Sequence, residues 1–295
     1  MGGTRQIQEA KEDLLMNTIQ NHQKKIMMIN DLSGYGRCSL TVAIPVLAAM
    51  KIQCCPVPTS IFSNHTGFSS WHVDDYTESM PKYLKKWEEL DLTFDGIAAG
   101  FLGSAKQIKI VEQAILAFKG PDTRVLIDPI MGDEGKAYAT YTEEMCKKMG
   151  HLISLADIIT PNVTEACILT GTPYKASGWK RRELEEMAQK LQDMGPKQVV
   201  ITGVLEGSYL TNTVAQPDQK IQFIRTRIAG KERPGTGDVF SSILAGGMVL
   251  GEELSDSVKK AARFVGECIA ISDKLEIPRE NGVCLEMILG KLISR

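Results

Sequence analysis

Short apolar runs recur along the chain from residue 26 onward, separated by longer stretches in which apolar residues repeat at helical spacing. Six of these runs are rich in Ile and Val, which is typical of strands buried on both faces of a sheet. They are Ile26–Asn30, Gln53–Pro58, Gly96–Ala99, Val125–Asp128, Asp157–Thr160 and Val199–Thr202. The stretches between them predict helices over Ser39–Met50, Tyr76–Leu90, Ala105–Phe118, Glu143–Leu155, Val163–Leu169 and Arg181–Met194.

The alternation of strands and helices predicts an α/β fold with right-handed crossovers and a mostly parallel central sheet. Ligands bind such open sheets beyond the carboxyl ends of the strands. The later segments Tyr209–Val214 and Gln222–Ile228 alternate around a polar turn, and they predict an antiparallel hairpin at the sheet edge. Further helices are expected over Asp238–Leu250, Ser255–Ile271 and Cys284–Ile293.

The 295-residue chain contains no repeat and no low-complexity linker, so we expect a single domain over residues 26–295. Residues 1–25 are polar and only weakly amphipathic. We expect them to form a poorly ordered extension, with at most a frayed helix.

Charge and composition exclude several classes of protein. The 34 Lys and Arg residues nearly balance 36 Asp and Glu, which argues against a nucleic-acid binder because such proteins need a basic surface. No apolar run approaches the roughly 18 to 20 residues that span a bilayer, and the N-terminus has no signal-peptide core, so a cytoplasmic protein without a membrane partner is expected. The seven cysteines form no Cys-x-x-Cys pair and are interpreted as reduced thiols.

The strongest chemical signal is Pro234-Gly235-Thr236-Gly237-Asp238, which runs directly into a predicted helix. The two glycines let the backbone approach a ligand closely, and the unpaired N–H groups of a helix start bind anions. Asp238 lies in the first turn, where it can accept a proton while the amides hold phosphoryl oxygens. Taken alone, the motif fits a glycine-rich helix cap equally well.

Other phosphate-binding signatures are missing from the sequence. There is no P-loop motif, and Gly34-Tyr35-Gly36 lacks the third glycine of a dinucleotide fingerprint because Ser39 stands in its place. The chain is therefore neither a P-loop NTPase nor an obvious NAD-dependent dehydrogenase.

The glycine-rich motif and several further segments resemble the ribokinase-like superfamily and, within it, the pyridoxal kinases. These segments follow the family's order and approximate spacing between residues 26 and 293. They are Ser63–Gly67, Asp128-Pro129 with Gly132-Asp133, Ala156–Asn162 leading to Glu165, and Val199–Thr202. The resemblance implies a three-layer α/β sandwich with a mostly parallel sheet and a small antiparallel edge hairpin.

The activity implied by the resemblance is ATP-dependent phosphorylation of the 5′-hydroxymethyl group of pyridoxal, pyridoxamine or pyridoxine. Asp238 matches the family's base, which takes the hydroxymethyl proton, while Gly235, Thr236 and Gly237 match its anion hole. Because phosphoryl transfer depends mainly on positioning and charge neutralisation, a carboxylate and a ring of amides suffice.

Several polar residues match the family's nucleotide side: Asp128, Tyr138, Thr160, Asn162, Glu165 and Thr202. Asp128, Asp133 and Glu165 are the acidic residues expected to hold Mg²⁺, partly through water. A monovalent cation such as K⁺ is a further expected cofactor. Without the resemblance, Asp128-Pro129 is simply a turn that ends a strand, and Asn162 with Glu165 marks a helix start.

On the substrate side, Ser33, His65 and Thr66 match positions that contact the pyridine ring and its substituents. Phe101 stands where animal-type sequences have Tyr, and Gly34 stands where many members have His. These departures leave the preferred vitamer open. Trp71 is expected either to cover the pocket or to pack structurally.

A hydroxymethylpyrimidine kinase of the same superfamily is the main alternative. The resemblance disfavours it, because that branch typically reads Gly-Thr-Gly-Cys and has Cys at the position of Asp238. A non-catalytic B6-binding protein is the alternative from a different class. It is disfavoured because a carrier has no use for a base aimed at a γ-phosphate. The expected partners are a B6 vitamer, ATP and a second copy of the chain in a homodimer.

Overall fold

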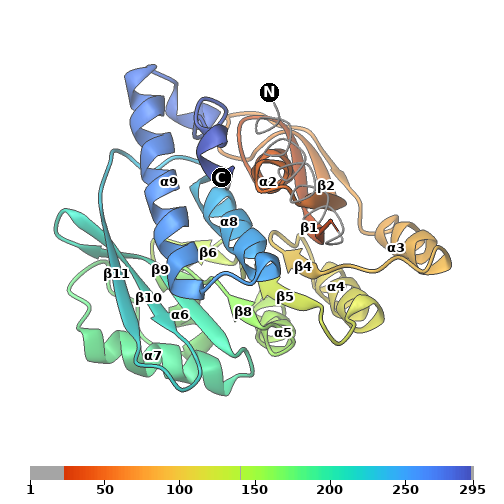
Figure 1. Cartoon of the computed structure of the whole chain (residues 1–295), viewed down its shortest axis with the longest axis horizontal. Coiled ribbons are helices and arrows are strands. Elements are labelled where there is room, and N and C mark those ends of the chain that lie inside the picture. Colours follow the sequence, from red (N-terminus) through yellow and green to blue (C-terminus); the bar gives the residue numbers. More distant parts are fainter. Residues whose placement is uncertain (1–22, 140, 294–295) are drawn as a thin grey trace, which may run out of the picture.

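A nine-stranded sheet forms the centre of the computed structural model, which describes residues 23–139 and 141–293 (Figure 1). The strand order is β11-β10-β9-β8-β5-β4-β1-β2-β3. The strands are β1 (Lys25–Tyr35), β2 (Gln53–Asn64), β3 (Val73–Asp75), β4 (Gly96–Ala99), β5 (Arg124–Ile127), β8 (Ile158–Ile159), β9 (Gln198–Glu206), β10 (Tyr209–Ala215) and β11 (Gln222–Arg227). A separate hairpin joins β6 (Gly132–Asp133) to β7 (Lys136–Ala137).

The predicted topology is confirmed in its main features. Every neighbouring pair from β9 to β2 is parallel, and β10 with β11 forms the predicted antiparallel hairpin at one edge. At the other edge, β3 adds a short antiparallel strand that was not predicted. Its three residues are all exposed, so they leave no apolar pattern in the sequence.

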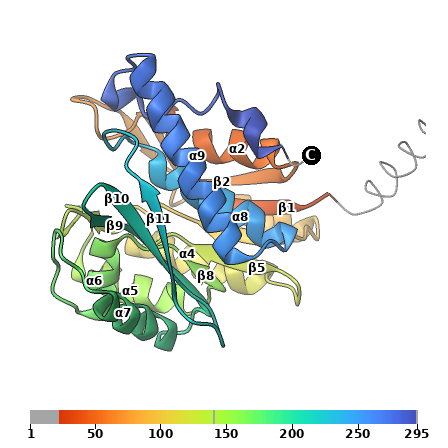
Figure 2. The same ribbon diagram turned by 60° about the vertical axis from the view of Figure 1, so that its left-hand side comes forward.

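Helices cover both faces of the sheet and make the fold three-layered (Figure 2). The helices are α2 (Ser39–Ala49), α3 (Met80–Glu89), α4 (Ala105–Phe118), α5 (Glu143–Ile153), α6 (Val163–Thr170), α7 (Arg181–Asp193), α8 (Thr236–Leu250) and α9 (Leu254–Lys274). One core lies between the sheet and α3 to α7, and the other between the sheet and α2, α8 and α9.

Strand β1 shows why its sequence is almost continuously apolar. Met27 and Ile29 point into one core, while Ile26 and Met28 point into the other. Alternate side chains of a strand face opposite sides of the sheet, so a strand covered on both sides needs apolar residues at every position.

One predicted helix is wrong. Over Cys284–Ile293 the chain forms only a 3₁₀ turn at Leu289–Leu292, and a second 3₁₀ turn lies earlier at Arg279–Asn281. Val283, Cys284 and Leu285 are buried in succession, and Val283 and Leu285 join the core formed with α2, α8 and α9. Their apolar character reflects packing of an irregular segment against the core rather than helix formation.

The boundaries at the N-terminal end also differ from the prediction. Of the expected extension, residues 1–22 lie outside the described residues, and Lys25 already begins β1. Strand β1 continues past Asn30 to Tyr35, with a register shift against β2 between Asn30 and Leu32. Among the described residues, no helix is both long and apolar enough to cross a membrane.

Candidate active site

The candidate site lies where the parallel strands end and α8 begins. Most of the predicted polar residues meet at this edge because the carboxyl ends of parallel strands point the same way. In order across the sheet, these polar residues are Thr202 in β9, Thr160 after β8, Asp128 after β5 and Ser33 in β1, and the apolar Phe101 follows β4 between Asp128 and Ser33.

The predicted anion hole is a tight loop, which we call the anion loop (residues 234–238). Gly235 has φ +85°, and a Cβ at this position would lie 1.9 Å from the carbonyl oxygen of Arg37. Only glycine fits there. A Cβ on Gly237 would meet no atom within 4 Å, so this residue faces open space. No side chain caps the helix start, and its first N–H groups can therefore bind an anion.

Asp238 lies in the first turn of α8 and is half-buried. Burial, and to a smaller extent the charge of Asp31, raise its pKa to about 6. Hydrogen bonds from the Ser39 backbone and the Asn30 side chain act in the opposite direction. The distance from Asn30 Nδ2 to Asp238 Oδ1 is 3.4 Å. A carboxyl group with this pKa is mostly ionised at neutral pH and can accept a proton.

Two residues of the site, Asn30 and Asp31, were not singled out from the sequence. Asn30 Oδ1 accepts hydrogen bonds from the backbone N–H groups of Asp31 (3.0 Å) and Phe101 (2.9 Å), and thus joins the middle of β1 to the loop after β4. Asp31 accepts hydrogen bonds from Ser39 Oγ (2.5 Å) and Ser33 Oγ (3.0 Å). The sequence offered one signal for them, since this polar pair directly follows the apolar residues 26–29.

The hydroxyl of Ser33, which was predicted to contact the substrate, is already hydrogen-bonded within the protein. Ser33 is completely buried, and its hydroxyl is bonded to Asp31. A contact between Ser33 and a substrate would require that hydroxyl to exchange partners.

Asp128 follows β5 and lies close enough to Asp238 for the two charges to interact. Burial, and then the charge of Asp238, raise the Asp128 pKa to about 7. The neighbouring Thr160 hydroxyl lowers this pKa, yet it makes no hydrogen bond of good geometry among the described residues. Two close carboxylates without a cation nearby repel each other, so this region favours a bound cation.

Asn162 and Glu165 form a capping box at the start of α6. Asn162 Oδ1 accepts from the Glu165 N–H (2.9 Å), and Glu165 Oε2 accepts from the Asn162 N–H (2.8 Å). Both side chains also hold the loop after β5, through the Met131 N–H and the Gly132 carbonyl. Burial and the charge of Asp128 raise the Glu165 pKa.

The remaining nucleotide-side residues lie nearer the surface. Asp133 is exposed on the β6–β7 hairpin, Tyr138 is 43% exposed, and Thr202 is half-buried beside Asn162. Within residues 23–139 and 141–293, no three acidic, His or Cys side chains are arranged to hold a metal ion. A Mg²⁺ ion held by Asp128 and Asp133 would therefore need phosphate oxygens and water as further ligands.

On the substrate side, His65 is fixed by both ring nitrogens. Nδ1 accepts from the Gly67 N–H (3.1 Å), so Nε2 carries the proton and donates to the Glu280 carbonyl (2.7 Å). The imidazole also packs against Phe68, with ring centroids 4.7 Å apart. Thr66 and Trp71 are both exposed.

A buried network of hydrogen bonds holds the loop that carries Phe101. The carbonyl of Phe101 accepts from Thr59 Oγ1 (3.1 Å), and its ring packs edge-on against Phe62. Thr59 in turn belongs to β2, so the loop after β4 is attached to the neighbouring half of the sheet.

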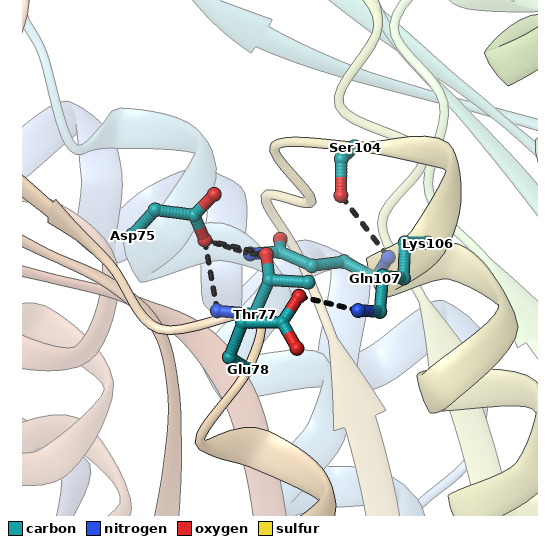
Figure 3. A network of polar contacts seen from close by, with 6 residues as sticks. All are labelled: Asp75, Thr77, Glu78, Ser104, Lys106 and Gln107. Atoms are coloured by element: carbon teal, nitrogen blue, oxygen red, sulfur yellow. Dashed lines mark hydrogen bonds and ion pairs between the residues drawn. The ribbon is translucent and has the colours of Figure 1, made fainter.

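The centre of this network is Gln107, which is 1% exposed (Figure 3). Its Nε2 donates to the Thr59 carbonyl and the Thr77 hydroxyl, both at 2.8 Å, and to Asp75 Oδ1 at 3.2 Å. Its Oε1 accepts from the Gly103 N–H at 2.7 Å. A buried amide with all its partners in place fixes the loop that carries Phe101.

Comparison with known proteins identifies the family. A family model described as phosphomethylpyrimidine kinase matches residues 40–284. The chain belongs to this family. It is also 28% identical to the pyridoxine/pyridoxal/pyridoxamine kinase of Bordetella pertussis (strain Tohama I) over 280 residues, covering 90% of this chain and 93% of the relative.

Solved structures of the same kind superpose closely. A candidate phosphomethylpyrimidine kinase from Bacteroides thetaiotaomicron VPI-5482, in an orthorhombic form with pyridoxal, is 38% identical with a TM-score of 0.87, covering 92% of this chain and 96% of that chain. Pyridoxal kinase from Lactobacillus plantarum is 27% identical with a TM-score of 0.85, covering 92% and 97%. These matches confirm the predicted fold and the resemblance to pyridoxal kinases, and they confirm the prediction of a phosphotransferase.

Proposed function

We propose that this chain transfers the γ-phosphoryl group of ATP to the 5′-hydroxymethyl group of a vitamin B6 vitamer. The observation that carries the proposal is the position of Asp238, ionisable near neutral pH, in an anion loop whose Gly237 faces open space. The relative solved with pyridoxal supports the substrate class.

In the proposed reaction, Asp238 accepts the hydroxymethyl proton as the substrate oxygen attacks the γ-phosphorus. The amides of the anion loop neutralise charge on the phosphoryl oxygens during transfer. Mg²⁺ would supply further neutralisation, and Asp128 with Asp133 are the residues proposed to hold it. Asn162 and Glu165 keep the loop between these two acids in place. Tyr138, Thr160 and Thr202 are proposed to contact the nucleotide.

The vitamer is proposed to lie against Phe101, within reach of His65 and Thr66. Both ring nitrogens of His65 are already hydrogen-bonded, Nε2 to the Glu280 carbonyl and Nδ1 to the Gly67 N–H, so a hydrogen bond to the vitamer would replace one of these two contacts. Because Gly34 and Phe101 stand where related sequences have His and Tyr, the proposed 4′ side has fewer polar side chains, and discrimination among the three vitamers should be weak.

The test is a substrate panel with ATP and Mg²⁺, with product followed by mass and ADP release followed in parallel. We expect phosphorylation of pyridoxal, pyridoxamine and pyridoxine with kcat/KM values within about 100-fold of one another. ADP release that does not depend on any vitamer, with no phosphorylated product, would overturn the proposal.

Hydroxymethylpyrimidine is the second candidate substrate, because a relative from Aquifex aeolicus (strain VF5), 28% identical over 186 residues, is a hydroxymethylpyrimidine/phosphomethylpyrimidine kinase. The same panel decides between them. Preferential phosphorylation of hydroxymethylpyrimidine would replace the substrate while leaving Asp238 and the anion loop in their proposed roles.

Two further proposals concern a monovalent cation and the oligomeric state. Dependence of the activity on K⁺ is tested by replacing K⁺ with Na⁺ or choline. The homodimer is tested by light scattering of the purified protein.

A further inference from the structure

The segment after α9 touches three loops of the candidate site at once. We call residues 277–281 the C-terminal strap. Its carbonyl groups accept hydrogen bonds from His65 (at Glu280, 2.7 Å) and Arg37 (at Asn281, 3.1 Å). His65 belongs to the proposed vitamer loop, and Arg37 lies between β1 and α2.

The third contact comes from Arg233, immediately before the anion loop. Its Nη1 donates to the carbonyls of Ile277 (2.8 Å) and Pro278 (3.1 Å), and its Nη2 forms an ion pair with Asp273 of α9 (2.8 Å). The side chain of Arg233 is only 7% exposed. A buried guanidinium holds its partners in a fixed geometry, because its donors lie in one plane.

The backbone of Arg233 continues this support into the anion loop. Its carbonyl oxygen accepts from the Thr236 hydroxyl at 3.1 Å and from the Thr236 N–H at 3.5 Å. Thr236 lies between the two glycines whose amides are proposed to bind phosphoryl oxygens. A shift of Arg233 would therefore move those amides, although Arg233 itself is not in the proposed anion hole.

We propose that Arg233 is a positioning residue, which holds the anion loop in register with the vitamer loop by binding the C-terminal strap and Asp273. The inference rests on the proposed function. A displacement of these amides by a fraction of an ångström should weaken their stabilisation of the transition state more than their binding of the substrates. A substitution of Arg233 should therefore lower kcat more than it changes KM.

Two variants test the proposal by different routes. Arg233→Lys keeps the positive charge but cannot bind Asp273 and both carbonyls in the same planar arrangement. Asp273→Asn removes the ion pair from the outer side, where the carboxylate is 44% exposed, and so leaves the buried guanidinium in place. We expect kcat to fall about 10-fold for Arg233→Lys and about 3-fold for Asp273→Asn, with KM values for ATP and vitamer within about 3-fold.

Lys260→Met is the matched control. Lys260 of α9 pairs with Glu252 (2.5 Å), just beyond the other end of α8. Its loss also breaks a link between α9 and the α8 region, but far from the anion loop. The control should lower the melting temperature while leaving kcat within about 2-fold of the wild type, because a purely structural loss changes the folded fraction rather than the chemistry.

Hydrogen exchange gives a readout that does not depend on turnover. The Thr236 and Val239 amides, which donate to the Arg233 and Gly235 carbonyls, should exchange faster in Arg233→Lys and Asp273→Asn than in the wild type, but not in Lys260→Met. Wild-type kcat and exchange in both site variants would overturn the role of Arg233. If the wild type phosphorylates no vitamer, the proposed function fails, while the exchange comparison still decides whether Arg233 positions the loop.

Discussion

Asp238 acquires its chemistry from its surroundings. Burial and the charge of Asp31 together raise its pKa to about 6, and the proton can be accepted only by the ionised form. Activity should therefore decline as the pH falls through about 6. An aspartate with an ordinary pKa would show no decline there, because it would remain ionised throughout this range.

The neighbouring carboxylate offers a direct test of this electrostatic argument. Asp31→Asn removes a negative charge that raises the Asp238 pKa, so the acidic limb of kcat/KM should move to lower pH. The measurement is a pH–rate profile of both proteins with the same vitamer, which cancels the substrate's own titration. A limb that stays in place, or moves to higher pH, would exclude Asp31 as a source of the shift.

Removing the base itself should have a larger effect. Asp238→Asn preserves the size of the side chain and the start of α8, but it cannot accept the proton. We expect kcat to drop by roughly 10²-fold or more with nucleotide affinity largely retained. Steady-state kinetics and a nucleotide-binding titration check this, and near-wild-type turnover would remove Asp238 from the base role.

At the scale of elements, substitutions of the two glycines in the anion loop should have different effects, one on stability and the other on activity. Gly235→Ala places a methyl group against the Arg37 carbonyl at a residue with φ +85°, so it should destabilise the fold. Gly237→Ala adds its methyl group to open space and should leave the melting temperature unchanged or slightly higher. If phosphate groups occupy that space, Gly237→Ala should nevertheless lower kcat/KM about 10-fold or more. Full activity of this folded variant would place the phosphates elsewhere.

The capping box of α6 makes a second prediction at this scale. Gln can replace Glu in a capping box, but it has one acceptor oxygen, so Glu165→Gln keeps the bond from the Asn162 N–H only by losing the bond from the Met131 N–H. It removes the charge beside Asp128, and the Mg²⁺ concentration for half-maximal activity should rise more than the vitamer KM. The two titrations are compared at saturating ATP. An unchanged Mg²⁺ dependence would leave Glu165 with a purely structural role.

Whether an element could be predicted from the sequence depended on how it is buried and how long it is. Strands such as β1 and β4 were predictable because burial on both faces leaves an unbroken apolar run. Strand β3 and the β6–β7 hairpin are too short and exposed to leave such a pattern. The wrong helix at Cys284–Ile293 arose because consecutive buried residues in an irregular segment resemble a helical apolar stretch.

The site was predictable where one short motif carries the chemistry, as at Gly235–Asp238. It was not predictable where distant residues meet. Asn30 contacts Phe101, 71 positions later, and Asp238, 208 positions later, and only the folded sheet brings these residues together. Gln107 and Arg233 escaped notice for the same reason, because a lone Gln or Arg has no local signature.

For the molecule as a whole, the buried acids of the site oppose folding at neutral pH. Asp128 changes from an ordinary pKa of 3.8 to about 7 on folding, and Asp238 from 3.8 to about 6. A carboxyl group whose pKa is raised on folding binds protons more tightly in the native state. Its favourable contribution is complete below the unfolded value and is lost as the pH rises through the folded value.

The ligand-free protein should therefore become more stable as the pH falls from about 7.5 to about 5.5. Surface acids with lowered pKa values, such as Glu183, weaken the fold only below about 4.5 and do not mask the effect. Asp128→Asn removes the carboxyl group whose pKa rises further than that of Asp238 on folding, and it should flatten the dependence of melting temperature on pH. Calorimetry of both proteins across this range measures the two slopes. Equal slopes would show that Asp128 is as accessible to water as an ordinary surface carboxylate, and the repulsion proposed to attract a cation at this place would then be absent.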